Sequence, residues 1–127
     1  MKSLIIYYSR RGQNYVNGSV KNLVKGNAEL IAEFIRNAVD ADVFEVDTVK
    51  PYDEDYMVCI EEAKAELRAK ARPALKEMLG DVSAYDTIFA VGPNWWGAKI
   101  GESLAVHGGS APASRAQVEA WAKRAVQ

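Results

Sequence analysis

Cysteine and histidine are almost absent from this chain of 127 residues, which has one of each, Cys59 and His107. A single cysteine excludes a disulfide within the chain. His107 stands beside Gly108-Gly109 with no cysteine or acid cluster nearby, so we interpret it as a turn residue rather than a metal ligand. Cys59 has no partner thiol and no basic neighbour in its expected helix. We therefore expect it to be a small, buried apolar residue.

Long apolar runs and an excess of basic residues are also absent. No segment is long enough to span a bilayer, and the apolar run after Lys2 is too short for a signal peptide. The 16 Lys and Arg residues are balanced by 17 Asp and Glu, which argues against a nucleic-acid binder. We therefore expect a cytoplasmic protein with no nucleic-acid or membrane partner, and a single domain over residues 1–127.

The most informative stretch is the apolar run at residues 3–8, between Lys2 and Ser9. An apolar run without alternation is typical of a strand that is buried on both faces of a parallel sheet. The run at 86–92 has the same character, and both strands are expected to be central. In an open parallel sheet the ligand site lies at the carboxyl ends of the strands, where Ser9 stands.

Strand and helix patterns alternate along the chain. A hairpin is expected around Asn17-Gly18, and Asn27 is expected to cap the first helix. A break at 50–52 precedes the second helix, and a short helical turn is expected at 74–79. The expected strands are 3–8, 42–47, 86–92 and 103–107, and the expected helices are 29–39, 53 or 54 to 70, and 112–126. This order predicts an α/β domain with a doubly wound parallel sheet and helices on both faces.

Each expected helix has an apolar stripe with helical spacing. The stripes are Leu30, Ile31, Phe34, Ile35 and Ala38; Tyr56, Ile60, Ala63 and Leu67; and Val118, Trp121, Ala122 and Ala125.

The first loop with candidate chemistry follows the first strand. It begins with Ser9-Arg10 and ends with Gly26-Asn27-Ala28 at the start of a helix. Free amides at a helix N-terminus with a nearby hydroxyl favour an anion, and phosphate is the usual one. The alternative is that Ser9 and Asn27 only cap turns and the helix.

The second such loop is Pro93-Asn94-Trp95-Trp96-Gly97, directly after the strand at 86–92. Two adjacent tryptophans can hardly both pack inward, so one of them could stack on a planar aromatic ligand. The alternatives are an oligomer interface or a cover over the end of the sheet. A phosphate at one loop and a flat ring at the other together suggest a mononucleotide-like cofactor.

These segments resemble a bacterial flavodoxin-like family over nearly the whole chain. The resemblance rests on Leu4–Arg10, Lys50-Pro51-Tyr52, the segments around Ala63–Glu66 and Ala71–Lys76, Tyr85–Phe89 and Pro93–Gly97. In that family a Ser-x-x-Gly-Asn-Thr loop holds the phosphate of flavin mononucleotide (FMN). Here the expected hairpin splits that pattern, and Ala28 stands where the family has threonine.

The resemblance implies a flavodoxin-like fold and noncovalent FMN binding. Ser9, Arg10, Gly26, Asn27 and Ala28 would hold the phosphate, and Pro93, Asn94, Trp95, Trp96 and Gly97 would lie along the flavin ring. The flavin itself would carry out one- or two-electron chemistry, so no catalytic acid or base is expected. The partner would be a redox protein or a small-molecule electron acceptor, as for an electron carrier or a small quinone or nitro reductase.

One strand–helix unit of the family pattern is absent before the segment at 103–126. About ten residues separate Gly92 from Ser103, which is short for a parallel crossover. We therefore expect a homodimer in which residues 103–126 exchange between subunits. Two rival hypotheses stay open: a non-enzymatic oligomeric binding or structural module that kept the fold with lost or weakened flavin binding, and a phosphate-sensing or phosphoryl-transfer domain.

Overall fold

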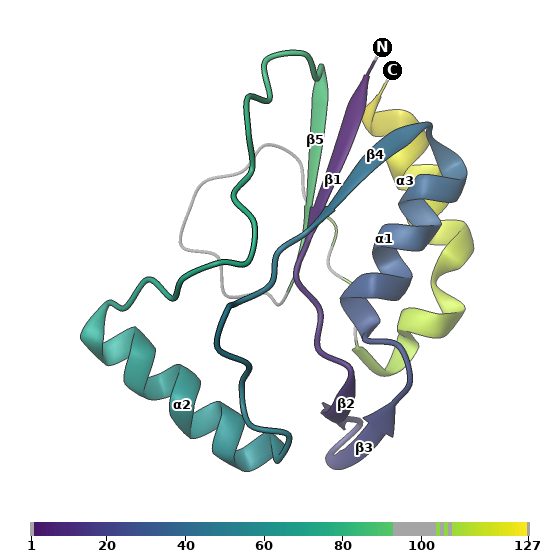
Figure 1. Ribbon diagram of the computed structural model, residues 1–127. Coiled ribbons are helices and arrows are strands. Elements are labelled where there is room, and N and C mark those ends of the chain that lie inside the picture. The colour runs from purple at the N-terminus through teal and green to yellow at the C-terminus, as the bar shows by residue number, and fades with distance from the viewer. Residues whose placement is uncertain (1, 93–103, 105, 107, 127) are drawn as a thin grey trace.

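In the described part of the chain, three parallel strands form the main sheet, in the order β4-β1-β5. The computed structural model describes residues 2–92, 104, 106 and 108–126 (Figure 1). The strands are β1 (Ser3–Tyr7), β4 (Ala41–Glu45) and β5 (Thr87–Val91). The central place of β1 is confirmed. The prediction that the third strand is also central is wrong for the described part of the chain, where β5 is an edge strand.

The remaining elements follow the predicted alternation of strands and helices. The helices are α1 (Asn27–Ala38), α2 (Tyr56–Ala69) and α3 (Arg115–Ala125), and a 3-10 helix, η1 (Gly108–Ala113), precedes α3. The α/β class with a parallel sheet is therefore confirmed. The crossover through α1 leads from β1 to β4 on one side of it, and the crossover through α2 leads from β4 to β5 on the other side of β1.

One face of the sheet carries the hydrophobic core. Ile5 and Phe89 point to this face and are buried against Ile35 of α1 and Val118 of α3. The ring of Phe89 meets the ring of Trp121 edge to face, with centroids 5.7 Å apart. Figure 1 shows α1 and α3 side by side on this side of the sheet. The apolar stripes predicted for these two helices pack on the core except for Leu30, and Ala32 of α1, which was not predicted, is buried there as well.

Helix α2 departs from the doubly wound arrangement that the sequence predicts. It lies on the other side of the sheet from α1 and α3, but it is set away from the strands (Figure 1). None of its residues is buried, and Leu67 of its predicted inner face is 72% exposed. In this structure the second face of the sheet is not covered by α2.

The predicted hairpin is confirmed. It consists of β2 (Gly12–Val16) and β3 (Ser19–Leu23), which pair in an antiparallel register. Asn17 and Gly18 both have positive φ, at 51° and 87°, as a two-residue type I′ turn requires. The hairpin lies at the carboxyl end of the sheet (Figure 1).

Two other local predictions turn out differently. The helical turn predicted at 74–79 is wrong, because Leu75 instead forms an antiparallel bridge with Thr48. The strand predicted at 103–107 lies outside the described residues except for Leu104 and Val106, which are not in a strand and pack against the core. Among the described residues no helix is long and apolar enough to cross a membrane.

Candidate functional site

The strands that precede the two predicted ligand loops end side by side. The backbone N–H of Tyr8, just after β1, donates to the carbonyl of Val91 at the end of β5, at 3.1 Å. The chain order reverses between these strands, because β4 lies on one side of β1 and β5 on the other. This is the position at which open α/β sheets bind ligands. The residues predicted to lie along the ring, Pro93 to Gly97, are outside the described part of the chain.

Ser9 and Gly26 come together at the start of α1. The Oγ of Ser9 accepts a hydrogen bond from the backbone N–H of Glu29 at 3.2 Å. The backbones approach so closely that a Cβ on Gly26 would lie 2.0 Å from the Oγ of Ser9 and 2.6 Å from the carbonyl oxygen of Arg10. Ser9 therefore caps α1 from 20 residues away in the sequence.

The prediction that Asn27 caps the first helix is wrong. Gly26 is the N-cap residue, and Asn27 and Ala28 form the first turn of α1. The N–H of Glu29 is bonded to Ser9 and that of Leu30 to the carbonyl of Gly26. In the described structure the N–H groups of Asn27 and Ala28 are thus the first-turn donors left for an anion.

Arg10 holds α2 rather than the start of α1. Its Nε donates to the carbonyl of Gln13 at 2.7 Å, and one terminal nitrogen donates to the carbonyls of Asp53 and Glu54, both at 2.9 Å. Its guanidinium also lies 6.0 Å from the ring centre of Tyr56, the first residue of α2. All these contacts go to the hairpin or to the start of α2, so a role of Arg10 in binding phosphate would require it to change partners.

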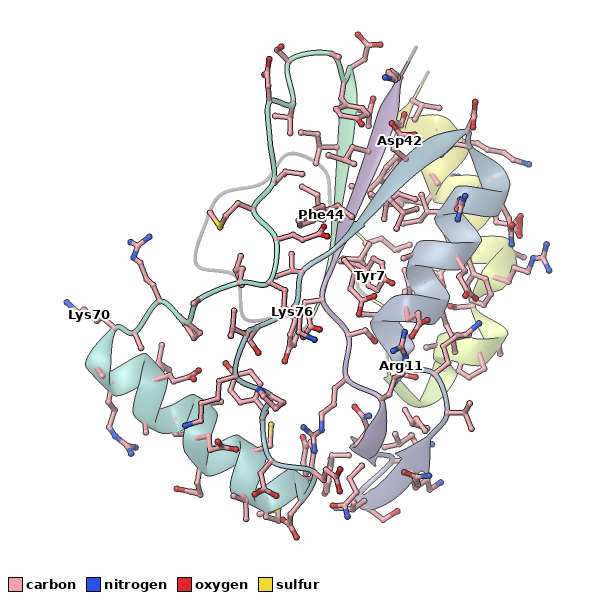
Figure 2. All side chains as sticks on the ribbon, viewed as in Figure 1. Tyr7, Arg11, Asp42, Phe44, Lys70 and Lys76 are labelled. Carbon is pink, nitrogen blue, oxygen red and sulfur yellow. The ribbon has the colours of Figure 1, made fainter. Side chains whose placement is uncertain are left out.

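Arg11, which the sequence did not predict as a site residue, pairs with an acid in the first turn of α1. Its guanidinium forms two hydrogen bonds to the carboxylate of Glu29, at 3.0 and 3.1 Å. This pairing raises the pKa of Arg11, and its side chain is 59% exposed. Figure 2 shows Arg11 beside the lower end of α1, close to Tyr7. An acid in the first turn of a helix with a basic residue in the preceding loop could have indicated this pair.

Tyr7 lies next to this pair. Its hydroxyl donates to the carboxylate of Glu45 at 3.0 Å, and its side chain is only 8% exposed. Burial, followed by the hydrogen bond to Glu45, raises the pKa of Tyr7 to about 12. A hollow of about 110 Å³ adjoins it, with Glu33 and Arg36 of α1 in its wall. The carboxylates of Glu29 and Glu45 thus lie close to the start of α1 and would disfavour an anion there.

These residues fit the phosphate of FMN in part. The N–H groups of Asn27 and Ala28 and the hydroxyl hydrogen of Ser9 are available donors, and Arg11 supplies a positive charge. Ala28 has no hydroxyl, and the carboxylate of Glu29 would repel a phosphate unless Arg11 neutralised it. Within the described residues no three His, Cys, Asp or Glu side chains form a group that could hold a metal ion.

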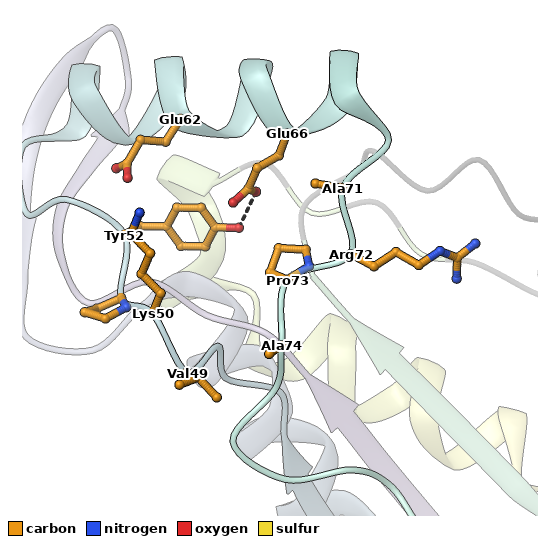
Figure 3. A pocket seen from close by; sticks show the side chains of 10 residues that line it. Val49, Lys50, Tyr52, Glu62, Glu66, Ala71, Arg72, Pro73 and Ala74 are labelled. Atoms are coloured by element: carbon orange, nitrogen blue, oxygen red, sulfur yellow. Dashed lines mark hydrogen bonds between the residues drawn. The ribbon is translucent and has the colours of Figure 1, made fainter.

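A larger hollow of about 380 Å³ lies beneath α2 (Figure 3). Glu62 and Glu66 form its α2 side, and the segments at 49–52 and 71–74 form the other. The hydroxyl of Tyr52 donates to Glu66 at 2.6 Å, and Glu62 accepts from the backbone N–H of Asp53 at 2.8 Å. Both carboxylates are thus already used to hold the segment before α2 against the helix.

Comparison with known proteins identifies no relative: no protein-family model matches the chain, and neither the curated proteins nor the solved structures contain a match.

Proposed function

We propose that the protein is a flavodoxin-like FMN-binding redox protein whose sheet lacks one strand–helix unit of that fold. The observation that carries the proposal is that β1 and β5, the strands before the two candidate loops, end side by side, where the N–H of Tyr8 donates to the carbonyl of Val91. In the strand order β4-β1-β5 these two strand ends lie at the point where the chain order reverses. A phosphate at the start of α1 and a ring along the second loop would then bind from neighbouring strand ends.

Each residue has a distinct part in this proposal. Ser9, Asn27 and Ala28 would donate hydrogen bonds to the phosphate, Gly26 would allow the tight turn, and Arg10 or Arg11 would balance its charge. Trp95 or Trp96, within the loop 93–97, would stack on the ring. When bound, FMN supplies one- or two-electron transfer to a redox partner protein or a small-molecule acceptor, as in an electron carrier or a small quinone or nitro reductase.

A fluorescence titration with two flavins tests the proposal. We expect quenching of FMN fluorescence at micromolar or higher protein concentration, because Ser9 already serves α1 and Ala28 lacks a hydroxyl. Riboflavin, which has no phosphate, should bind more weakly because the donors at the start of α1 would have no partner. No quenching of FMN up to high micromolar protein concentration would refute FMN binding.

Ala28→Thr should sharpen the same measurement. A hydroxyl at this half-buried first-turn position would add a hydrogen bond to a charged phosphate. Such a bond contributes about 1.5 kcal/mol or more, so we expect FMN binding to tighten about tenfold. Riboflavin binding and FMN binding by the control Ala65→Thr on α2 should not change. Equal effects of Ala28→Thr on both flavins would contradict phosphate binding at this turn.

The second candidate is a non-enzymatic binding or structural module that kept the fold. The closure of the first loop on itself favours it, since Ser9 is bonded to the helix and Gly26 has no space beside it. This hypothesis predicts a folded protein that binds neither FMN nor riboflavin and that assembles as an oligomer. The same titration, combined with sedimentation, distinguishes it from the first candidate.

The homodimer with exchange of residues 103–126 stays a prediction. In this structure α3 packs against α1 of its own chain, with Val118 and Ala122 fully buried. An exchanged dimer would therefore form the same α1–α3 contact between subunits, which is the usual form of such an exchange.

A further inference from the structure

Helix α2 has apolar side chains, but none of them is fully buried. Met57 and Leu67 are 61% and 72% exposed. Leu67 belongs to the inner stripe that its spacing predicts, together with Ile60, which is half-buried, and Ala63, which is exposed. An amphipathic helix gains most of its stability from packing such a stripe. The position of α2 in this structure therefore leaves apolar area unpacked.

The second face of the sheet has the complementary property. By the alternation of side chains along strands, Ile6, Phe44, Ile88 and Ala90 point away from α1 and α3. Ile88 is 46% exposed, Ala90 is exposed, and Ile6 and Phe44 are half-buried, whereas Leu4 on the same face is buried. The sheet thus presents a partly open apolar face on the side where α2 lies (Figure 1).

The chain connectivity specifies which element fits this face. α2 lies in the crossover from the carboxyl end of β4 to the amino end of β5, and this crossover passes β1. Right-handed parallel crossovers place their helix on the sheet, and α1 already occupies the opposite face. A helix of 14 residues is about 21 Å long, close to the length of the strands that it would cover. No other described helix is tethered at both ends to the strands beside β1.

The N-terminal end of α2 is already at the carboxyl end of the sheet. Arg10 holds it there through the carbonyls of Asp53 and Glu54. The side-chain oxygen of Gln13 accepts from the N–H of Tyr56 at 2.9 Å, and the rings of Tyr15 and Tyr56 stack with centroids 6.2 Å apart. These contacts fix one end of the helix. Near its other end Glu66 accepts from the hydroxyl of Tyr52, which ties the helix to the segment that leads into it and not to the sheet.

A short two-stranded contact joins the segments before and after α2. We call it the clasp, and it consists of residues 47–49 and 74–76. The N–H of Val49 donates to Ala74, the N–H of Lys76 donates to Asp47, both at 2.9 Å, and the Lys76 ammonium lies 3.0 Å from the Asp47 carboxylate. The hollow of about 380 Å³ lies between α2 and the clasp, with Val49 and Ala74 of the clasp in its wall (Figure 3).

We propose that α2 is a hinged arm that closes onto the open face of the sheet. It pivots at its N-terminal contacts with Arg10, and opening of the clasp releases it. Closure brings Ala63 and Leu67 over Ile88 and Ala90 and removes the hollow beneath the helix. The clasp is weak enough for this role, since it has two backbone hydrogen bonds and an ion pair whose side chains are 61% and 50% exposed.

Disulfide trapping tests the closure. In a Cys59→Ser background, Leu67→Cys and Ile88→Cys place one thiol on the inner stripe and one on the sheet face. Closure should allow an intramolecular disulfide, because the two Cα atoms must come within about 7 Å for one to form. The control pair is Ala65→Cys with Ile88→Cys, since residue 65 lies on the opposite side of α2. The first pair should oxidise about tenfold faster than the control pair, which never meets this distance.

The clasp gives an independent test. Lys76→Glu places a second carboxylate beside that of Asp47 and should speed trapping about threefold, the magnitude expected for an exposed ion pair. Lys123→Glu makes the same charge change on α3 and should have no effect. Equal rates for the two cysteine pairs would overturn the proposal, and so would exclusively intermolecular disulfides, which would show that a second copy covers the face.

Amide hydrogen exchange tests the opening of the clasp on the unmodified chain, without any substitution. The N–H groups of Val49 and Lys76 should exchange faster than those of β1, and high salt should accelerate them by weakening the ion pair. Protection of these two amides equal to that of β1 would refute an opening clasp, even if the cysteine variants failed to fold.

Discussion

At the scale of single residues, Gly26 is needed because there is no space for a Cβ, and not because of its backbone conformation. Its φ of −65° is accessible to any residue, yet a Cβ would collide with the Oγ of Ser9 and the carbonyl of Arg10. Gly26→Ala should therefore lower the free energy of unfolding by about 1–3 kcal/mol, as measured by urea denaturation. Gly80→Ala, where a Cβ meets nothing within 4 Å, is the control and should stay within about 0.5 kcal/mol. Equal stability of the two variants would contradict the close approach.

The raised pKa of Tyr7 predicts that the stability of the folded chain depends on pH. Its pKa is raised to about 12 in the folded chain, whereas an unfolded tyrosine ionises near its ordinary value of 10. Between these values the unfolded chain binds fewer protons than the folded chain, so stability falls as pH rises. The drop attributable to Tyr7 should be about 2 kcal/mol between roughly pH 10 and 12.

Tyr7→Phe tests this assignment. Urea denaturation of the variant should show a shallower loss of stability over that pH interval than the parent does. Tyr15→Phe, at a ring that is 57% exposed, controls for the loss of a phenol elsewhere. If Tyr7→Phe and the parent lose stability in parallel, Tyr7 is not the group responsible.

At the scale of elements, α2 depends on local contacts more than α1 or α3 does. The side chain of Asp55 caps it by accepting from the N–H groups of Met57 and Val58, at 3.0 and 3.1 Å. Asp55→Ala should cost about 1 kcal/mol, and Asp55→Ser should restore most of it. Because α2 has no buried residue, the loss should appear as faster amide exchange within 56–69 rather than throughout the chain.

A matched substitution separates capping from charge. Asp40→Ala removes an exposed acid between α1 and β4 and should leave exchange in α2 unchanged. Uniformly faster exchange after Asp55→Ala would instead show that α2 unfolds together with the core.

At the scale of the whole molecule, α3 completes the core on which the sheet depends. Val118 is fully buried, so Val118→Ala should destabilise the chain by about 1–3 kcal/mol through lost burial and a residual cavity. Val24→Ala, at a side chain that is 92% exposed, should be neutral. Urea denaturation compares the two, and a neutral Val118→Ala would contradict the packing of α3 against α1.

Assembly also belongs to this scale. We expect sedimentation of the full chain at micromolar concentration to give twice the mass of the 14.0 kDa chain. Truncation after Gly101 should abolish both the dimer and cooperative unfolding, because α3 is lost from the core. A monomeric full chain would refute the dimer, and a stable dimeric truncated chain would show that the C-terminal segment does not join the subunits.

The sequence alone determined the elements whose signals are local. The apolar run of β1, the stripe of α1 and the Asn17-Gly18 turn each reflect burial or backbone preference within a few residues, and the structure confirms them. The position of Ser9 at the end of the first strand was likewise predictable. The loop at 93–97 and its place in the site remain predictions.

Only the tertiary structure decided which side chains meet. Ser9, not Asn27, caps α1, and Arg11, not Arg10, accompanies its first turn, because contacts between residues far apart in the chain select one of several similar side chains. The stripe of α2 predicted packing, yet the clasp of Asp47 with Lys76 and the tie to Arg10 hold the helix away from the sheet. Periodicity identifies the face of a helix that can be buried, and the tethers at its ends determine whether that face reaches the core.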